Sequence, residues 1–340
     1  MTILLFLFFY LLICSITNSK YIFMLNSFII SLLIGFRTDN VGVDTGTYKY
    51  MYSYIGENGY AGYPEPFYGY LNYILYNCDV SFHNFQYLLS VTILVLFTLS
   101  IKKYSSHINF SLFLLYALFF VFYAMNITRQ ILAVLIVLYG YTLLHEAKKM
   151  KFVFCVLVAS LFHYAAIISL VVLFVRKINF CNKTLFYGGI FLTLLVGVLL
   201  NESIFRSILG PYAMYLNTDG SGIRNSVRLL QAVLLCTFWS ILCIFIYATA
   251  KKAFIDSFWF KIYFTGILLN NLTLNLELGL RIVMFFSISQ IIVYVLYIDD
   301  TRITFYYISP MVIVAFVFIF FLVFLINGSV GVVPYTNLYI

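Results

Sequence analysis

The stretch KFVFCVLVASLFHYAAIISLVVLFVR, residues 151–176, decides how the rest of the chain is arranged. It is long enough to cross a bilayer once, because about 20 apolar residues span the hydrocarbon core. A single crossing would put the lysines and arginines that follow it on the outer side. Two short half-helices that meet near FHYAA, residues 162–166, would instead return both ends to the cytoplasm, where membrane proteins concentrate Lys and Arg. We therefore interpret the stretch as a broken-helix hairpin, whose tip is buried against protein or lines a cavity.

Apolar runs of spanning length continue on both sides of this hairpin. Only 9% of the 340 residues are charged, against about 25% in ordinary globular proteins. The sequence therefore predicts an all-α polytopic integral membrane protein of about 10–12 transmembrane helices, organised as a single transmembrane domain over residues 1–340. The candidate spans besides the hairpin are residues 2–17, 21–36, 83–101, 110–126, 128–144, 185–200, 229–249, 258–276, 281–298 and 304–326.

Two longer loops fall on the outer side in this topology, at residues 37–66 and 201–227. The aromatic run FYGYLNYILY that follows the first loop predicts an interfacial helix over residues 67–77. Tyrosines are frequent between residues 48 and 73. They either stack on the faces of sugars or anchor the chain at the membrane interface, where tyrosine is generally enriched.

Lysine and arginine sort to opposite sides under this topology. Eleven lysines and two arginines face the cytoplasm, whereas six arginines and one lysine face outward. Lysine suffices as a topological charge, while the guanidinium fork of arginine holds phosphate or carboxylate through two parallel hydrogen bonds. One outer arginine alone is as readily a lipid-headgroup anchor. Six of them on the side that should be poor in positive charge favour an anion-binding role.

Arg37 leaves the end of the second span in FRTDNVGVDTGTYKY, residues 36–50. Gly42 and Gly46 allow the backbone to turn back sharply, and Asp44 or Thr45 can cap a short helix that follows. We expect Arg37 to bind an anionic group of the substrate and Asp44 to be a candidate catalytic base. The alternative is that Arg37 is only an anchor and Asp44 only a helix cap.

Arg129 falls in AMNITRQILA, residues 124–133, where one span ends at the outer surface and the next begins. The first turn of a helix carries the positive end of the dipole and unsatisfied amides, which together favour an anion. A cation at this place costs a few tenths of a kcal/mol unless an anion lies beside it. This local conflict favours a functional role, and we predict that Arg129 takes part in substrate binding and catalysis.

His163 lies deep in an apolar stretch, at the tip of the predicted hairpin. Polar residues at membrane depth are usually functional, and a neutral imidazole can take a proton from a sugar hydroxyl. His163 is therefore the second candidate base. The alternative is a core histidine whose hydrogen bonds are satisfied by its neighbours.

Three further arginines are candidates on the outer side. Arg224 and Arg228 are four residues apart and share one face of the helix that enters the next span. Arg281 begins a late span, where Glu277 at the same spacing offers a simple ion-pair partner. We expect Arg224, Arg228 and Arg281 to contribute to substrate binding, on the strength of charge and placement.

Several kinds of chemistry have no motif in this sequence. It contains no P-loop, no GxSxG and no His/Cys ligand cluster, and its six cysteines are scattered. The adjacent Asp299 and Asp300 face the cytoplasm in this topology. We therefore predict no bound metal and no cofactor. The net charge of +8 sets the membrane topology rather than indicating nucleic acid.

Five segments, in this order along the chain, resemble the EpsG-like group of bacterial polysaccharide polymerases, which are related to the Wzy O-antigen polymerases. They are FRTDNVGVDTGTY (36–48), EPFYGYLNYIL (65–75), NITRQILA (126–133), ASLFHYAAII (159–168) and the span-starting Arg281. The most specific parts are those around Arg37 and Arg129. The family often has a serine two residues after the histidine. Ala165 stands there in this chain, so no serine-assisted role is carried over.

The resemblance implies a GT-C-like polymerase architecture in the bacterial inner (plasma) membrane, with the active site facing the periplasm or exterior. The donor and the acceptor would both be oligosaccharides linked to undecaprenyl diphosphate, and the growing glycan would pass to a hydroxyl of the next repeat unit. A chain-length regulator would be a further partner. Arg37 and Arg129 are then the first candidates to hold the diphosphates.

Two other functions fit a cavity lined by arginines. A lipid-linked oligosaccharide flippase or transporter should show repeated halves with matching broken helices, which the sequence does not display. An O-antigen ligase uses closely related chemistry, and only the family resemblance favours a polymerase over it.

Overall fold

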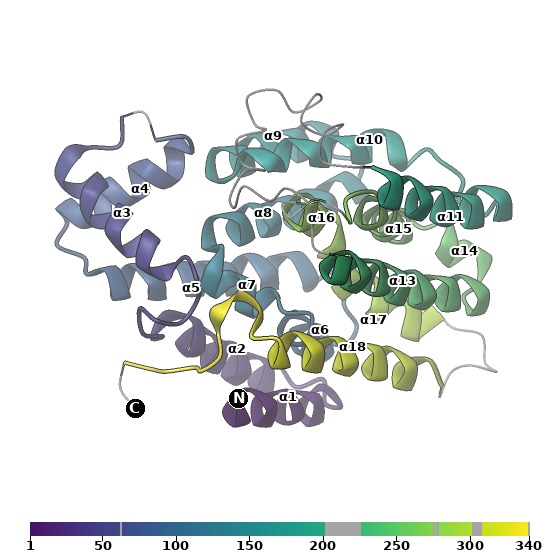
Figure 1. Ribbon diagram of the computed structural model, residues 1–340, viewed down its shortest axis with the longest axis horizontal. Helices are drawn as coiled ribbons and strands as arrows, with labels where there is room; N and C mark the ends of the chain where they lie inside the picture. Colours follow the sequence, from purple (N-terminus) through teal and green to yellow (C-terminus); the bar gives the residue numbers. More distant parts are fainter. Residues whose placement is uncertain (62, 201–225, 275, 277–278, 301–307, 339–340) are drawn as a thin grey trace. The chain divides into compact units, whose positions relative to one another are not determined.

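Helices account for the ordered architecture of the computed structural model (Figure 1). The structure describes residues 1–61, 63–200, 226–274, 276, 279–300 and 308–338. These ranges hold no strand, although Arg37 and Asn337 pair in an isolated bridge, so the prediction of an all-α protein is confirmed. The α-helices are α1 (Thr2–Ser15), α2 (Lys20–Gly35), α3 (Thr45–Asn58), α4 (Pro66–Asn77), α5 (Phe82–Ile101), α6 (Ile108–Ala117), α7 (Phe120–Asn126), α8 (Thr128–His145), α9 (Lys149–Phe162), α10 (Val172–Val175), α11 (Lys183–Leu199), α13 (Ser226–Thr249), α14 (Lys252–Ile255), α15 (Phe258–Leu272), α16 (Gly279–Ser287), α17 (Gln290–Asp300) and α18 (Ile308–Ile326).

The length and composition of these helices are those of a multi-pass membrane protein. Within the described residues, five helical segments are long and apolar enough to cross a bilayer, and α6 with α7 makes a sixth if the bent pair is one span. The five are α5, α8, Leu229–Thr249 of α13, Gly279–Asp300 and α18. Four shorter apolar helices, at Thr2–Ser15, Lys20–Gly35, Tyr164–Val175 and Lys183–Leu199, fall at other predicted spans.

One predicted span is broken at a point where the sequence predicts a continuous helix. Residues 110–126 were expected to form one helix, but α6 and α7 meet at a bend of 52°. Phe119, at the break, has φ 69°, in the left-handed region that a non-glycine residue rarely adopts. Its ring packs against Phe321 and Phe324 of α18, with centroids 5.6 and 5.3 Å away. Aromatic packing thus holds the chain in the bent conformation.

The predicted break in residues 151–176 is confirmed. α9 ends at Phe162, and His163 follows with extended backbone (φ −158°, ψ 116°). A 3₁₀-helix, η1 (Tyr164–Val171), then leads into α10. His163 therefore lies between two short helical pieces, within the stretch 162–166 where the sequence predicted that they meet. The return of the second piece to the cytoplasm stays a prediction.

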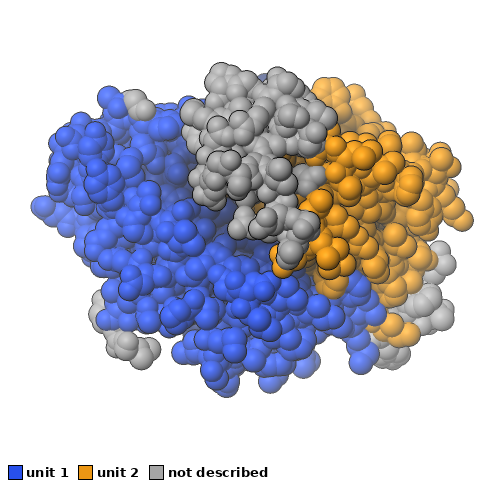
Figure 2. All heavy atoms as spheres, viewed as in Figure 1, with its two compact units in different colours: residues 1–167, 311–340 blue, residues 168–310 orange. Residues whose placement is uncertain are grey.

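The chain forms two compact units (Figure 2), residues 1–167 with 311–340 and residues 168–310. In the first unit α8 packs along α9, α2 along α5, and α3 against α4. The close approach of α8 and α9 depends on Gly140, where an added Cβ would lie 3.0 Å from Cβ of Cys155. In the second unit α15 packs against α11, α13 and α16.

The segment near the carboxyl end of the chain lies beside the residues that follow α2. The backbone N–H of Thr38 donates to the carbonyl of Thr336 (3.2 Å), and that of Leu338 donates to the carbonyl of Phe36 (3.0 Å). The Tyr335 hydroxyl donates to the carbonyl of Leu33 at 2.8 Å. The residues on either side of Arg37 are therefore fixed by a segment about 300 residues away.

Candidate active site

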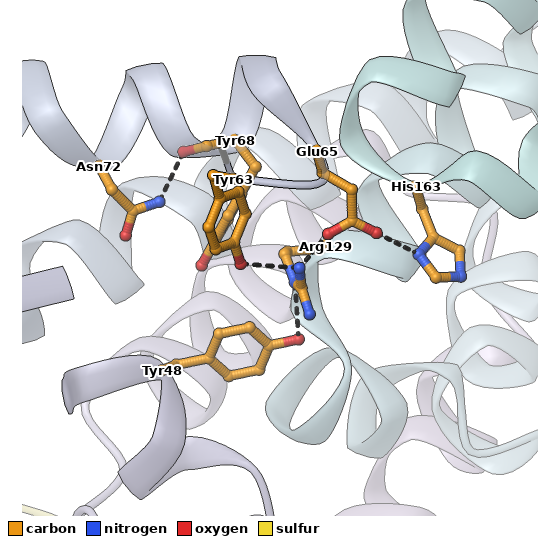
Figure 3. A network of polar contacts seen from close by, with 7 residues as sticks. All are labelled: Tyr48, Tyr63, Glu65, Tyr68, Asn72, Arg129 and His163. Atoms are coloured by element: carbon orange, nitrogen blue, oxygen red, sulfur yellow. Dashed lines mark hydrogen bonds and ion pairs between the residues drawn. The ribbon is translucent and has the colours of Figure 1, made fainter. Parts of the chain in front are cut away.

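A single carboxylate, that of Glu65, joins two of the side chains that the sequence analysis singled out (Figure 3). One of its oxygens, Oε2, accepts a hydrogen bond from Nη1 of Arg129, and the other, Oε1, lies 2.7 Å from Nδ1 of His163. Glu65 is only 6% exposed. A buried carboxylate requires charged or hydrogen-bonding partners, and here each oxygen has its own.

Each member of this group stands at the end of a helix. Glu65 directly precedes Pro66, the first residue of α4, and proline restricts the residue before it to extended backbone (φ −115°, ψ 90°). Arg129 lies in the first turn of α8, and His163 follows the last residue of α9. Because α9 packs against both α8 and α4, the three ends meet.

An aromatic contact fixes the approach of α4 to α9. The rings of Phe67, two residues after Glu65, and Phe162, one residue before His163, have centroids 4.9 Å apart. The contact between carboxylate and imidazole is thus supported by packing on either side of it. This arrangement explains why the break in the hairpin falls at His163, because the extended residue turns its ring toward Glu65.

Three tyrosine rings surround the guanidinium of Arg129 (Figure 3). Its Cζ atom lies 5.3 Å from the ring centroid of Tyr48, 5.7 Å from that of Tyr63 and 5.5 Å from that of Tyr68. Cations at this distance are attracted by the ring faces. Nη1 also donates to the Tyr63 hydroxyl at 2.7 Å, and Nε makes a longer contact of 3.4 Å with the Tyr48 hydroxyl.

The tyrosine hydroxyls remain protonated at neutral pH. Burial raises the pKa of Tyr63 to about 12, and burial also raises the pKa of Tyr48 and, to a larger extent, that of Tyr68. A hydroxyl that accepts from a guanidinium keeps its own proton to donate. Tyr48 and Tyr63 can therefore donate to an anion bound at Arg129, besides accepting from it.

The side chains of Arg129, His163 and Glu65 differ in how far they are exposed. The side chain of Arg129 is 27% exposed and that of His163 is 18% exposed, whereas that of Glu65 is only 8% exposed. The guanidinium and the imidazole can thus be reached by a substrate. The carboxylate that links them is the more deeply buried group.

Arg37 lies in the framework next to this cluster and not in contact with Glu65. Its guanidinium is buried, with the residue 2% exposed, and donates to the carbonyls of Ile34 and Met125, the latter at 2.8 Å. Burial lowers its pKa to about 10, so the group remains charged at neutral pH. Arg37 ties the end of α2 to the end of α7, and its predicted contact with a diphosphate stays a prediction.

The helix expected after Asp44 is confirmed as α3, with Asp44 at its N-cap position. The carboxylate, however, makes no capping hydrogen bond; the backbone N–H of Asp44 donates to Oδ1 of Asn126 at 2.9 Å. Gly42 turns the backbone as expected, with φ 90°. Gly46 does not, because it lies inside the first turn of α3.

The remaining predicted arginines lie in the second unit or outside the described residues. Arg281 lies in the first turn of α16, in the second unit, and is exposed. Arg224 and the side chain of Arg228 lie outside the described residues, as does Glu277. Their predicted role in substrate binding stays a prediction. In the part of the chain that the structure describes, no three His, Cys, Asp or Glu residues are placed to hold a metal ion.

Glu65 has no role that could be predicted from the sequence, and the expected role of the tyrosines around residues 48–73 was either sugar stacking or interface anchoring. The structure places Glu65 around Arg129 together with Tyr48, Tyr63 and Tyr68. The conflict between a cation and the N-terminus of α8 was the signal that an anion was needed there. The structure supplies one from within the chain.

Helices of spanning length, together with a partly buried cluster of arginine, glutamate and histidine at the ends of α8, α4 and α9, define a multi-pass membrane protein with a polar site. The chain belongs to the EpsG family, whose family model matches residues 20–337, nearly the whole chain. This is a Wzy-like polymerase family, which confirms the resemblance seen in the sequence. No curated protein and no solved structure is significantly similar to the chain. Membership of the family indicates a glycosyltransferase of the polysaccharide-polymerase type.

Proposed function

We propose that this protein is a polysaccharide polymerase that moves a growing glycan from undecaprenyl diphosphate to a hydroxyl of the next lipid-linked repeat unit. The reaction takes place on the periplasmic or outer face of the bacterial plasma membrane. The observation that carries the proposal is the contact of one buried carboxylate, Glu65, with both Arg129 and His163. It brings a candidate base within reach of a cationic group suited to a phosphate.

His163 acts as the general base. When Nδ1–H donates to the Glu65 carboxylate, the imidazole is held in the tautomer whose Nε2 carries no proton. Nε2 then accepts the proton of the acceptor hydroxyl as its oxygen attacks the anomeric carbon. A base positioned in this way typically accelerates a reaction by about 10²–10⁴-fold. This geometry favours His163 over Asp44, the other candidate base.

Arg129 holds the diphosphate of the donor. As the new bond between the acceptor oxygen and the anomeric carbon forms, the bond from that carbon to the phosphate oxygen breaks, and its electron pair leaves with the diphosphate. Each charge-assisted hydrogen bond to the leaving group contributes about 1.5–3 kcal/mol, and donors fixed in advance stabilise the developing charge most. Tyr48 and Tyr63 are placed to donate further hydrogen bonds.

The other candidates keep supporting roles in this proposal. Arg224, Arg228 and Arg281 are further diphosphate-binding residues, and Arg37 maintains the framework beside Tyr48 and Tyr68, with which it lines a small cavity. The bilayer carries both lipid-linked substrates to the site. A chain-length regulator is a further proposed partner.

The proposal is tested by deleting the gene in a native host and returning it with His163→Gln. We expect the variant to leave surface glycan with a single repeat unit, seen as one band on a gel in place of a ladder. His83→Gln is the matched control, because His83 lies in the first turn of α5 in the same unit and is paired with Asp39. It should restore the full ladder.

Other results would point to other functions. A full ladder from His163→Gln at normal expression would exclude the base role, and a full ladder from the deletion strain would exclude polymerase activity. Long glycan that stays on the polyprenyl carrier would indicate a ligase. Single repeat units that remain on the cytoplasmic face would indicate a flippase.

A further inference from the structure

We propose that Glu65 competes with the donor's diphosphate for Arg129, so that donor binding frees the carboxylate to act on His163 alone. The inference rests on the proposed function, in which Arg129 holds a diphosphate. Glu65 then has two successive partners. In the free protein its carboxylate contacts Arg129 in place of a phosphate, and in the donor complex the carboxylate positions the base, His163.

The first ground for this inference is the way Arg129 is surrounded. Its guanidinium contacts three oxygen atoms, one from Glu65 and one each from the hydroxyls of Tyr63 and Tyr48. A phosphate group has the same requirement, since it presents two or three oxygens to a guanidinium fork. Oε2 of Glu65 thus occupies a place where one of those oxygens would bind.

The second ground is the division of the carboxylate between two partners. Because Oε1 contacts His163 and Oε2 contacts Arg129, Glu65 can give up one contact and keep the other. Pro66 and α4 fix the backbone at Glu65, so only the side chain needs to rotate. The contact with His163 needs no large movement of the chain.

The third ground is electrostatic. A diphosphate at Arg129 and the Glu65 carboxylate are like charges within a short distance of one guanidinium, and they repel each other. The carboxylate then favours the remaining positive group, which is the imidazolium that forms when His163 accepts a proton. The base is therefore strengthened only when the donor is in place, and the two halves of the reaction are coupled through one residue.

The experiment measures binding of geranyl diphosphate, a short isoprenoid diphosphate, to the full-length protein purified in detergent. Wild type should bind the probe, and Arg129→Ala should not. Glu65→Gln keeps the size of the side chain and removes the competing charge. We expect it to bind the probe about tenfold more tightly than wild type, which corresponds to one charge-assisted hydrogen bond no longer in competition.

Turnover should change in the opposite direction. In the native host, Glu65→Gln should give single-repeat glycan, because an amide orients and stabilises the imidazolium less well than a carboxylate. A merely structural residue would lower both binding and turnover when replaced. The combination of tighter binding with lost polymerisation is therefore specific to the proposed exchange. Glu57→Gln, an exposed carboxylate of α3, is the matched control and should change neither.

The outcomes separate this inference from the proposed function. Probe binding that depends on Arg129 but is equal or weaker in Glu65→Gln overturns the competition and leaves the diphosphate site intact. Wild-type binding that is absent, or unchanged in Arg129→Ala, overturns the proposed diphosphate site itself. Should Glu65→Gln fail to fold, Glu65→Asp replaces it. Its shorter carboxylate cannot reach both partners, so it should also bind the probe more tightly, and unchanged affinity would contradict the inference.

Discussion

The place of Arg129 in the first turn of a helix was predicted from the sequence, whereas the residues that surround it were not. That place could be predicted because NITRQILA marks the point where one apolar run ends and another begins. The residue that neutralises the charge of Arg129 could not be predicted. Glu65 lies 64 residues earlier, and the first outer loop offers other carboxylates, such as Asp39, Asp44 and Glu57. Only the packing of α4 against α9 selects among them.

The role of the tyrosines around Arg129 could not be decided from the sequence for a similar reason. An aromatic ring at a membrane interface and an aromatic ring beside a substrate look alike in a sequence. Tyr48 and Tyr68 are buried against the guanidinium, whereas Tyr50 and Tyr70 nearby are exposed. The difference is set by the faces that α3 and α4 turn toward each other.

Tyr63→Phe isolates the contribution of a hydroxyl. The ring that faces Arg129 is kept, but the hydrogen bond of 2.7 Å is lost. We expect about a tenfold lower rate of polymerisation, the equivalent of one hydrogen bond to a charged group. The glycan ladder of a complemented deletion strain, shifted to shorter chains, measures it.

The pH dependence provides a second check on Tyr63. Because burial raises its pKa to about 12, the phenol stays protonated across the neutral range, and no change in activity between pH 6 and about 9 should depend on it. Tyr60→Phe is the matched control, since Tyr60 contacts Tyr70 and Tyr73 and lies in the same loop. A Tyr63→Phe ladder identical to that of the control would remove the hydroxyl from the site.

At the level of elements, one break in a helical stretch could be predicted from the sequence and another could not. The break near His163 was predicted, because a single crossing by residues 151–176 would put the basic residues that follow them on the outer side. The bend between α6 and α7 was not, because the residues around Phe119 are apolar and the cause is the packing of Phe119 against α18. Long-range packing of apolar side chains leaves no mark in local composition.

The contact between α3 and α4 requires a residue without a side chain at Gly56, and this requirement can be tested. A Cβ at Gly56 would lie 2.0 Å from Cγ of Tyr76, which is far inside contact distance. Gly56→Ala should therefore destabilise the protein by about 1–3 kcal/mol through overpacking. Because the two helices carry Tyr48 and Tyr68, it should also shorten the glycan chains.

Gly46 supplies the control within the same helix. No atom lies within 4 Å of a Cβ added there, so Gly46→Ala should be neutral or stabilise by about 0.4–1 kcal/mol. The midpoint of heat-induced loss of the monodisperse species in size-exclusion chromatography measures both variants. A Gly56→Ala protein as stable as Gly46→Ala would show that α3 and α4 can separate without cost.

For the whole molecule, composition and apolar run length were enough to predict a helical membrane protein, and most predicted spans coincide with helices. The surroundings of Arg37 lie beyond this level of prediction. Its guanidinium is buried, and Tyr335 and Asn337, about 300 residues later, lie beside it. Contacts of that range are set by the complete fold. The expected contact of Arg37 with the substrate stays a prediction.

The orientation in the membrane can be measured directly. The broken hairpin predicts that the segment after α10 faces the cytoplasm, because Arg176 and Lys177 follow it. In a background without the six native cysteines, Lys177→Cys should be labelled by a maleimide only after the membrane is made permeable. Ser53→Cys on α3 should be labelled in intact cells. Labelling of position 177 from outside would mean that residues 151–176 cross the membrane once.

The pairing of Thr336 and Leu338 with the backbone around Arg37 has a practical consequence for producing this protein. Purification handles and fluorescent reporters are usually fused at a carboxyl terminus, and here a bulky fusion would pull on the segment that covers a buried guanidinium. An insertion at Lys102, which is exposed in the turn after α5, would leave that segment unchanged. A preparation that is inactive with a handle at one end therefore need not carry a damaged catalytic residue.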